Sequence, residues 1–167
     1  MSGKAGAYAA VLAAPFGRLG IRLQDGGLSA VEFVAADTPL RPPSEVLGHA
    51  VAEQMQRYFA DPCSAFTVPV VTCGTSFQRR VWAMLGAIPA GATRRYGDIA
   101  DALRSGARAV GLACRANPIP IVVPCHRVVA ARGLGGYAGE NVGQALHVKA
   151  WLLSHEQRCG ESTPQGR

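Results

Sequence analysis

The sequence contains no long hydrophobic run, no metal-binding motif and few acidic residues. No stretch approaches the roughly eighteen consecutive apolar residues of a membrane-spanning helix, and the Gly- and Ala-rich N-terminus does not resemble a secretory signal. The five cysteines have no short repeated spacing and no C-x-x-C motif, which argues against a disulfide framework and a structural zinc site. These absences predict a cytoplasmic protein with no membrane segment and no metal.

The scarcity of acids leaves a positive charge that is concentrated in the second half of the chain. Lys and Arg (17) outnumber Asp and Glu (11), giving a net charge of +6. Residues 1–74 carry −1 and residues 75–167 carry +7, and eleven of the twelve basic residues in the second part are arginine. Arginine binds phosphate through a fork of N–H donors, so this half favours a nucleic-acid partner. A basic surface kept for solubility is the alternative.

The first half of the chain predicts a small antiparallel sheet followed by one helix. Turn signals containing glycine separate three segments of apolar and β-branched residues. These segments are residues 8–14, 19–23 and 28–34. Apolar residues then recur at helical spacing from Leu47 to Phe59, with Ser44 as the expected cap, and a further strand is expected over 66–71. We expect this domain, residues 1–74, to support the rest.

The second half, residues 75–158, predicts a mostly helical domain. Thr75 or Ser76 is expected to cap a first helix, and two shorter helices follow on either side of a tight turn at Ser105-Gly106. This outline is typical of a helix-turn-helix, although an ordinary helical hairpin has the same pattern. A last helix is expected from about residue 142 to 155, followed by a disordered tail over 159–167. The fold class is therefore α+β, with a winged-helix-like second domain.

A cysteine and a histidine, Cys125 and His126, follow an apolar run that ends at Pro124. Only a thiolate is nucleophilic, so a reactive cysteine needs a base to take its proton. The turn expected at Pro124 lets adjacent side chains approach one another. The dipeptide is therefore a candidate nucleophile and base, although a buried cysteine beside a surface histidine would look the same.

The residues around this pair resemble the active-site region of the alkylguanine-DNA alkyltransferases. The resemblance covers about residues 75–158 and rests on NPIPIVVPCHRVV, GLGGYAG and VKAWLLSHE. It implies a monomer that repairs double-stranded DNA without a cofactor. The alkyl group on O6 of guanine, or on O4 of thymine, moves irreversibly to the protein's own cysteine after the base is rotated out of the duplex from the minor groove.

The same resemblance assigns roles to individual residues. Cys125 is the alkyl acceptor, His126 the base acting through a water molecule, and Glu156 the carboxylate that orients the imidazole. Tyr96 is expected to crowd the phosphate of the rotated nucleotide and to hydrogen-bond the base, and Arg108 to fill the gap left in the stack. Further DNA contacts are expected from Arg94, Arg95 and Arg115.

The remaining assignments concern the pocket for the base. Tyr137, in a loop expected to be flexible, is expected to lie against the base. The main chains of Val128 and Ala138 supply further contacts, and Asn117 braces the turn before the active-site segment. The sequence predicts that Lys149, on the last helix, has only a surface and structural role.

Two other functions use parts of this pattern. A DNA-binding regulator needs only the helix-turn-helix and the arginines. A cysteine hydrolase needs the thiol and the imidazole, but it also needs oxyanion donors, and its histidine usually lies far from the cysteine in sequence. The adjacency of Cys125 and His126 counts against the hydrolase.

Overall fold

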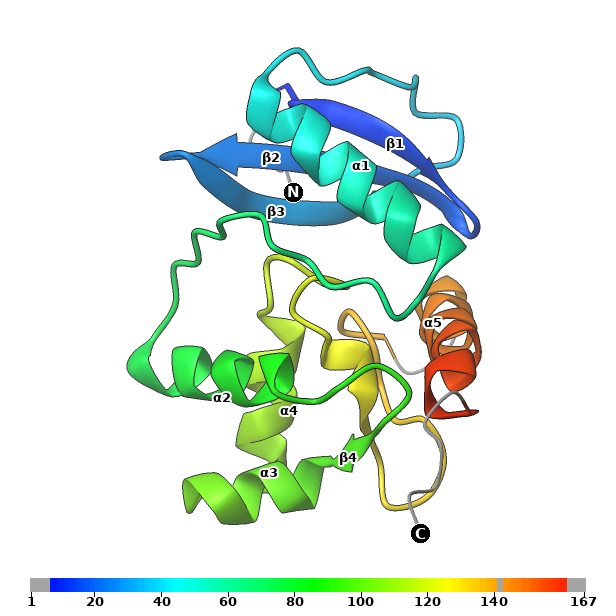
Figure 1. The fold of residues 1–167 in the computed structure, drawn as a ribbon. Coiled ribbons are helices and arrows are strands. Elements are labelled where there is room, and N and C mark those ends of the chain that lie inside the picture. Colours follow the sequence, from blue (N-terminus) through cyan, green and yellow to red (C-terminus); the bar gives the residue numbers. More distant parts are fainter. Residues whose placement is uncertain (1–6, 141–142, 162–167) are drawn as a thin grey trace, which may run out of the picture. The chain divides into compact units, whose positions relative to one another are not determined.

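The computed structural model describes residues 7–140 and 143–161, and the chain divides into two compact units between Val71 and Thr72. The first unit is a three-stranded sheet with one helix, and the second is mostly helical (Figure 1). The architecture is therefore α+β, as the sequence predicts. None of the helices among the described residues is long and apolar enough to cross a lipid bilayer.

The sheet of the first unit is the predicted antiparallel meander. Its strands are β1 (Ala10–Ala14), β2 (Gly17–Gln24) and β3 (Gly27–Val34), in that order across the sheet. Asp25 and Gly26, both with positive φ, form the β2–β3 turn and match the twist of a two-residue hairpin. Helix α1 (Val46–Ala60) lies across the sheet in Figure 1 and buries an apolar stripe that includes Val51 and Met55.

Two details of the first unit differ from the sequence-based expectation. Ser44 does not cap α1, because the cap position falls on Glu45, whose side chain makes no capping hydrogen bond. Residues 66–71 form no strand, and Val70 makes only an isolated bridge to β3. Pro69 explains this second difference, because it lacks the N–H group that a continuous ladder needs.

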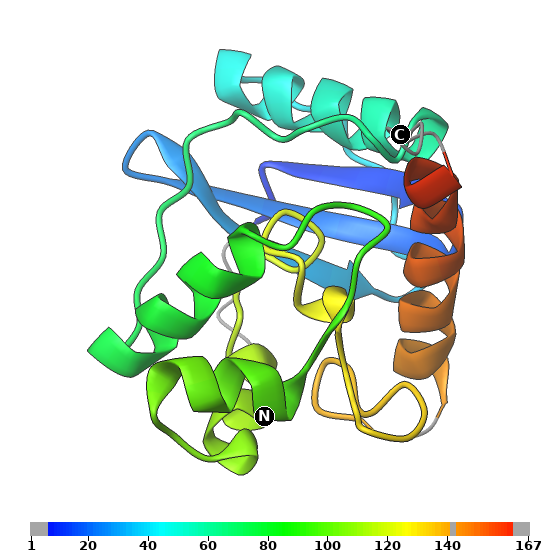
Figure 2. The same ribbon diagram turned by 60° about the horizontal axis from the view of Figure 1, so that its bottom comes forward.

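The second unit places the short segment that contains Cys125 among four helices. The helices are α2 (Ser76–Gly86), α3 (Tyr96–Leu103), α4 (Ala107–Arg115) and α5 (Gln144–Glu161). A one-turn 3₁₀ helix, η1 (Cys125–Arg127), leads into β5 (Val128–Val129), which pairs in parallel with β4 (Arg94–Arg95). In Figure 2 this segment lies between the α3–α4 pair and α5.

Helices α3 and α4 form the predicted helix-turn-helix. Arg104 ends α3 in the left-handed conformation, and the Ser105 N–H donates to the Ala100 carbonyl at 2.8 Å. Trp82 of α2 donates its indole N–H to the carbonyl of Ala113 at 2.8 Å. Helix α2 therefore holds α4 on its buried side, and the opposite face of α4 is left exposed.

The last helix is longer than predicted. Helix α5 continues to Glu161, so residues 159–161, which were expected to begin a disordered tail, are helical. No glycine or proline interrupts residues 144–159, and the helix therefore has no signal to stop near residue 155. The remainder of the predicted tail, residues 162–167, lies outside the described residues.

The cysteines fall into two groups. Cys73, Cys114 and Cys125 carry free thiols, whereas Cys63 and Cys159 are disulfide-bonded. The sequence predicts no disulfide framework, and it gives no sign that Cys63 and Cys159 are bonded. Spacing along the sequence does not report which thiols the fold brings together.

Candidate active site

Cys125 begins η1, at the end of a loop that the Asn117 side chain holds in place. Asn117 donates to the Val123 carbonyl at 2.8 Å and accepts from the Ile119 N–H at 3.1 Å. Ile119 and Ile121 are buried, and Ile121 has a φ of +75°, a rare conformation for a β-branched residue. These contacts fix the direction in which the chain enters η1, and with it the position of the thiol.

The thiol of Cys125 is nearly buried, with the residue 6% exposed. Burial raises its pKa, and hydrogen bonding from the side chains of Asn117 and Tyr137 and the positive charge of Lys149 act in the opposite direction. Because the pKa of the thiol remains above its ordinary value, the thiol is protonated at neutral pH. It therefore needs a base before it can act as a nucleophile.

The imidazole of His126 is fixed by the carboxylate of Glu156. Nε2 of His126 lies 2.9 Å from Oε1 of Glu156, and both side chains are almost fully buried. Burial lowers the pKa of His126, so the ring is neutral at pH 7. Its Nε2 then carries the proton donated to Glu156, and Nδ1, which is buried without a partner among the described residues, carries the lone pair.

Arg127 is a part of this network that the sequence analysis did not single out. Its Nε lies 2.9 Å from Oε2 of Glu156, its Nη2 lies 2.8 Å from Oε1, and its Nη1 donates to the Ile88 carbonyl. Burial alone raises the pKa of Glu156, but the hydrogen bonds from His126 and Arg127 outweigh it and lower the pKa to about 2. The carboxylate therefore stays ionised, although it is only 1% exposed.

Lys149 is the second residue whose role the sequence analysis missed. It was expected at the surface, yet it is completely buried. Its ammonium donates to the carbonyls of Val128 at 2.7 Å, Leu134 at 2.7 Å and Gly136 at 3.0 Å, and burial lowers its pKa to about 8. Lys149 thus ties β5 to the loop that follows it. A single lysine in a helical sequence gives no signal of such burial.

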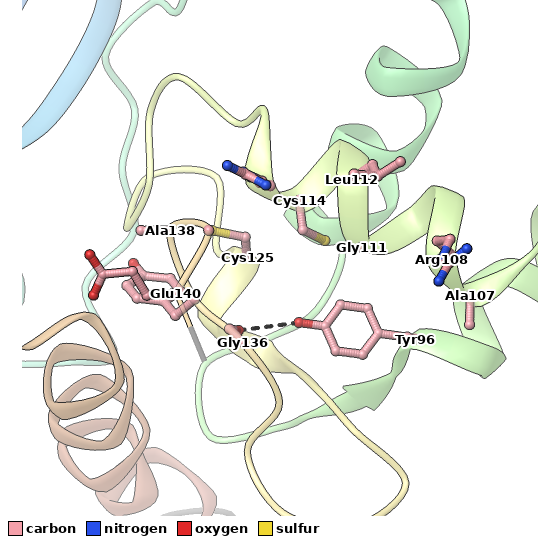
Figure 3. A pocket seen from close by; sticks show the side chains of 13 residues that line it. Tyr96, Ala107, Arg108, Gly111, Leu112, Cys114, Cys125, Gly136, Ala138 and Glu140 are labelled. Carbon is pink, nitrogen blue, oxygen red and sulfur yellow. Dashed lines mark hydrogen bonds between the residues drawn. The ribbon is translucent and has the colours of Figure 1, made fainter. Parts of the chain in front are cut away.

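A cavity of about 560 Å³ opens beside the thiol (Figure 3). The residues around it come from the start of α3, from α4, from η1 and from the loop after β5. They are Tyr96, Ala107, Arg108, Gly111, Leu112, Cys114, Arg115, Cys125 and residues 136–140. The hydroxyl of Tyr96 donates to the Gly136 carbonyl at 3.3 Å, and burial raises its pKa to about 12. No group of three potential metal ligands occurs among the described residues.

The loop that borders this cavity is ordered by a tight turn. Tyr137 and Glu140 exchange backbone hydrogen bonds of 2.8 and 2.9 Å, and Ala138 and Gly139 between them have positive φ. Tyr137 is 4% exposed, so its side chain is packed inside the protein, whereas the flexibility expected of the loop stays a prediction. A Cβ on Gly139 would lie 2.8 Å from Nε of Arg115, and this contact and the positive φ both favour glycine there.

The predicted site residues fall into four groups. Cys125, Tyr96, Arg108, Arg115, Tyr137 and Ala138 line the cavity. His126 and Glu156 lie buried in the network described above, and Val128 and Asn117 do not line the cavity. Arg94 and Arg95 are exposed on β4, where the Arg95 N–H donates to Asp98 at 3.1 Å. The structure therefore brings the thiol, the tyrosine and the arginines of α4 together around one opening.

A family model and similar curated relatives point to the same group of proteins. Residues 76–158 match the family model described as 6-O-methylguanine DNA methyltransferase, DNA binding domain. The chain is 38% identical over 160 residues to a methylated-DNA–protein-cysteine methyltransferase of Methanosarcina acetivorans, covering 91% of this chain and 99% of that relative. A protein of the same name from Mycobacterium leprae is 48% identical over 119 residues, 70% of this chain and 68% of the relative.

Solved structures agree with these relatives. The O6-methylguanine methyltransferase of Mycobacterium tuberculosis has a TM-score of 0.75 at 35% identity, covering 93% of this chain and 94% of that one. A structure of Mycobacterium tuberculosis OGT in complex with DNA also has a TM-score of 0.75, at 37% identity over 89% of this chain and 91% of that one. The chain belongs to the methylated-DNA–protein-cysteine methyltransferase family.

Proposed function

We propose that this protein repairs DNA by moving an alkyl group from O6 of guanine, or from O4 of thymine, onto its own Cys125. The observation that carries this proposal is the shared cavity, which both the thiol and Arg108 of the helix-turn-helix line. A nucleotide guided by α4 therefore meets the thiol. Because the product is a stable thioether, each molecule reacts once. In this proposal the protein acts as a monomer and needs no cofactor.

The network behind Cys125 supplies the acid–base chemistry. Glu156 binds the Nε2–H of His126, so Nδ1 is the nitrogen that receives the thiol proton, through a water molecule. The ionised carboxylate stabilises the imidazolium that results. The thiolate then attacks the alkyl carbon, so that the S–C bond forms as the C–O6 bond breaks. The thiol of Cys125 loses one proton and the departing guanine gains one, so the overall reaction neither consumes nor releases protons.

Delivery of the base requires that it leave the duplex. A stacked base cannot reach a nearly buried thiol, and rotating it out costs roughly a few kcal/mol. In our proposal α4 enters the minor groove and Arg108 occupies the space that the base vacates. Tyr96 crowds the phosphate of the rotated nucleotide and donates a proton to the leaving guanine. Arg94, Arg95 and Arg115 contact the DNA backbone.

The base itself is held by the loop that Lys149 anchors. Tyr137 lies against the base, and the Ala138 main chain borders the cavity it occupies. The contact between the Val128 main chain and the base stays a prediction. So does the role of Asn117 in bracing the turn between α4 and the segment that contains Cys125. Residues 1–74 have a supporting role, and a DNA substrate is consistent with the predicted cytoplasmic location.

Intact-mass measurement after incubation with a duplex containing O6-methylguanine tests this proposal. A single added methyl group on Cys125, absent from Cys125→Ala, is the expected result. Unmodified protein that still binds the duplex would support a regulator instead. Release of the methyl group from the DNA with the protein mass unchanged would support a hydrolase. Cys125→Ala is expected to keep the fold and the affinity for DNA.

A further inference from the structure

The exposed face of α4 carries a large apolar side chain that none of the roles above uses. Leu112 is 59% exposed, whereas Val110 and Ala113 on the other face of the helix are buried. Leu112 lies four residues after Arg108 and three before Arg115, so all three belong to one helical stripe. Figure 3 shows Arg108 and Leu112 projecting from α4 at the cavity.

The rest of this stripe shows why a leucine there is informative. Besides Leu112, the cavity-lining residues between the two arginines are Gly111 and Cys114, and Ala107, directly before Arg108, lines the same cavity. Small residues let a helix approach a groove closely. Among them, Leu112 extends further from the helix than any other side chain except the two arginines. A partner that docks on this stripe must therefore accommodate Leu112 between two positive charges.

We propose that Leu112 is a second wedge residue, which enters the minor groove beside Arg108 and covers the faces of the bases exposed when the damaged nucleotide rotates out. This inference rests on the proposed function. The flanking arginines and the +7 charge of residues 75–167 select DNA as the occupant. Apolar side chains inserted between base steps are an established way to stabilise an opened stack. Leu112 supplies the apolar contact, and Arg108 supplies a charged one.

The test compares Leu112→Ala with the unchanged protein in single-turnover methyl transfer. Alanine favours the helix, so the variant is expected to fold. Burying the exposed part of a leucine accounts for roughly a tenfold effect, so transfer from duplex DNA is expected to slow about tenfold. Transfer from the free base O6-methylguanine is expected to slow far less, because the free base leaves no opened stack for Leu112 to cover. The matched control is Leu40→Ala, at a leucine that is 54% exposed in the first unit, and it is expected to change neither rate.

A second substrate separates a wedge from an ordinary surface contact. When the damaged guanine lies in a single-stranded oligonucleotide, no ordered duplex stack has to be opened, so the loss caused by Leu112→Ala is expected to shrink. Leu112→Met, which keeps an apolar side chain of similar size, is expected to restore most of the duplex rate, and Leu112→Lys is not.

Several results would overturn the inference. They are an unchanged duplex rate in Leu112→Ala, an equal loss on the free base, or full activity of Leu112→Lys. An equal loss on the free base would place Leu112 in the pocket for the base. Failure of the unchanged protein to transfer any methyl group to Cys125 would instead refute the proposed function, so the two failures are distinguishable.

Discussion

Replacing Glu156 by glutamine tests the network behind the thiol most directly. The substitution keeps the size of the side chain but removes the charge that Arg127 and His126 bind. In the folded protein the pKa of Glu156 is lowered from 4.5 to about 2, a difference worth about 3 kcal/mol. Breaking a buried pair leaves the partner's charge uncompensated, so we expect a loss of about 3–5 kcal/mol in the free energy of unfolding.

The pH dependence of stability gives this prediction a second signature. Because the folded-state pKa is lowered, the unfolded chain binds a proton to Glu156 before the folded chain does as the pH falls. The stabilisation is therefore fully present above about pH 4.5 and is lost between there and about pH 2. Urea unfolding at several pH values is expected to show this loss in the original protein and a flatter profile in Glu156→Gln.

The same variant also tests the chemistry. An amide stabilises an imidazolium less well than a carboxylate does, and general bases contribute roughly 10²- to 10⁴-fold. Transfer from the free base is therefore expected to slow about 100-fold or more. Glu53→Gln is the matched control, because Glu53 pairs with Arg57 on an exposed helix surface. This substitution is expected to change the free energy of unfolding by less than about 1 kcal/mol. Equal free energies of unfolding and equal transfer rates in the two variants would contradict the role proposed for Glu156.

Three further predictions concern DNA and the loop. Arg108→Ala is expected to slow transfer from duplex DNA far more than transfer from the free base, and equal losses would contradict a stack-filling role. Lys149→Met leaves three carbonyls without their charged donor, so urea unfolding is expected to show a loss of about 3 kcal/mol, together with faster amide exchange near Gly136. Raising salt from about 50 to 200 mM is expected to weaken DNA binding steeply, seen by fluorescence anisotropy, and to leave free-base transfer unchanged.

The sequence predicts well what depends on local pattern. The strand meander follows from apolar segments separated by glycine turns, and Thr75 caps α2 as expected, with its hydroxyl 3.1 Å from the Gln78 N–H. The helix-turn-helix follows from the turn at Ser105-Gly106. The proposed nucleophile, Cys125, and its neighbour His126 are marked by a short motif, which is why their positions needed no tertiary information.

What the sequence leaves out depends on contacts between distant residues. Lys149 has no local feature that distinguishes it from a surface lysine, and only the fold brings three carbonyls to its ammonium. Arg127 lies inside the recognised motif, yet its partner Glu156 is 29 residues away. The exposure of Leu112 on α4 could not be predicted either, because the sequence pattern does not tell which face of a helix remains uncovered.

The raised pKa of Cys125 has a consequence for a protein that can act only once. Soluble alkylating agents and oxidants attack thiolates, and burial keeps the thiolate fraction of this cysteine small at neutral pH. We therefore expect the resting protein to react slowly with such agents in solution. In the proposed function, its acceptor capacity is thereby reserved for a base that has entered the cavity beside the thiol.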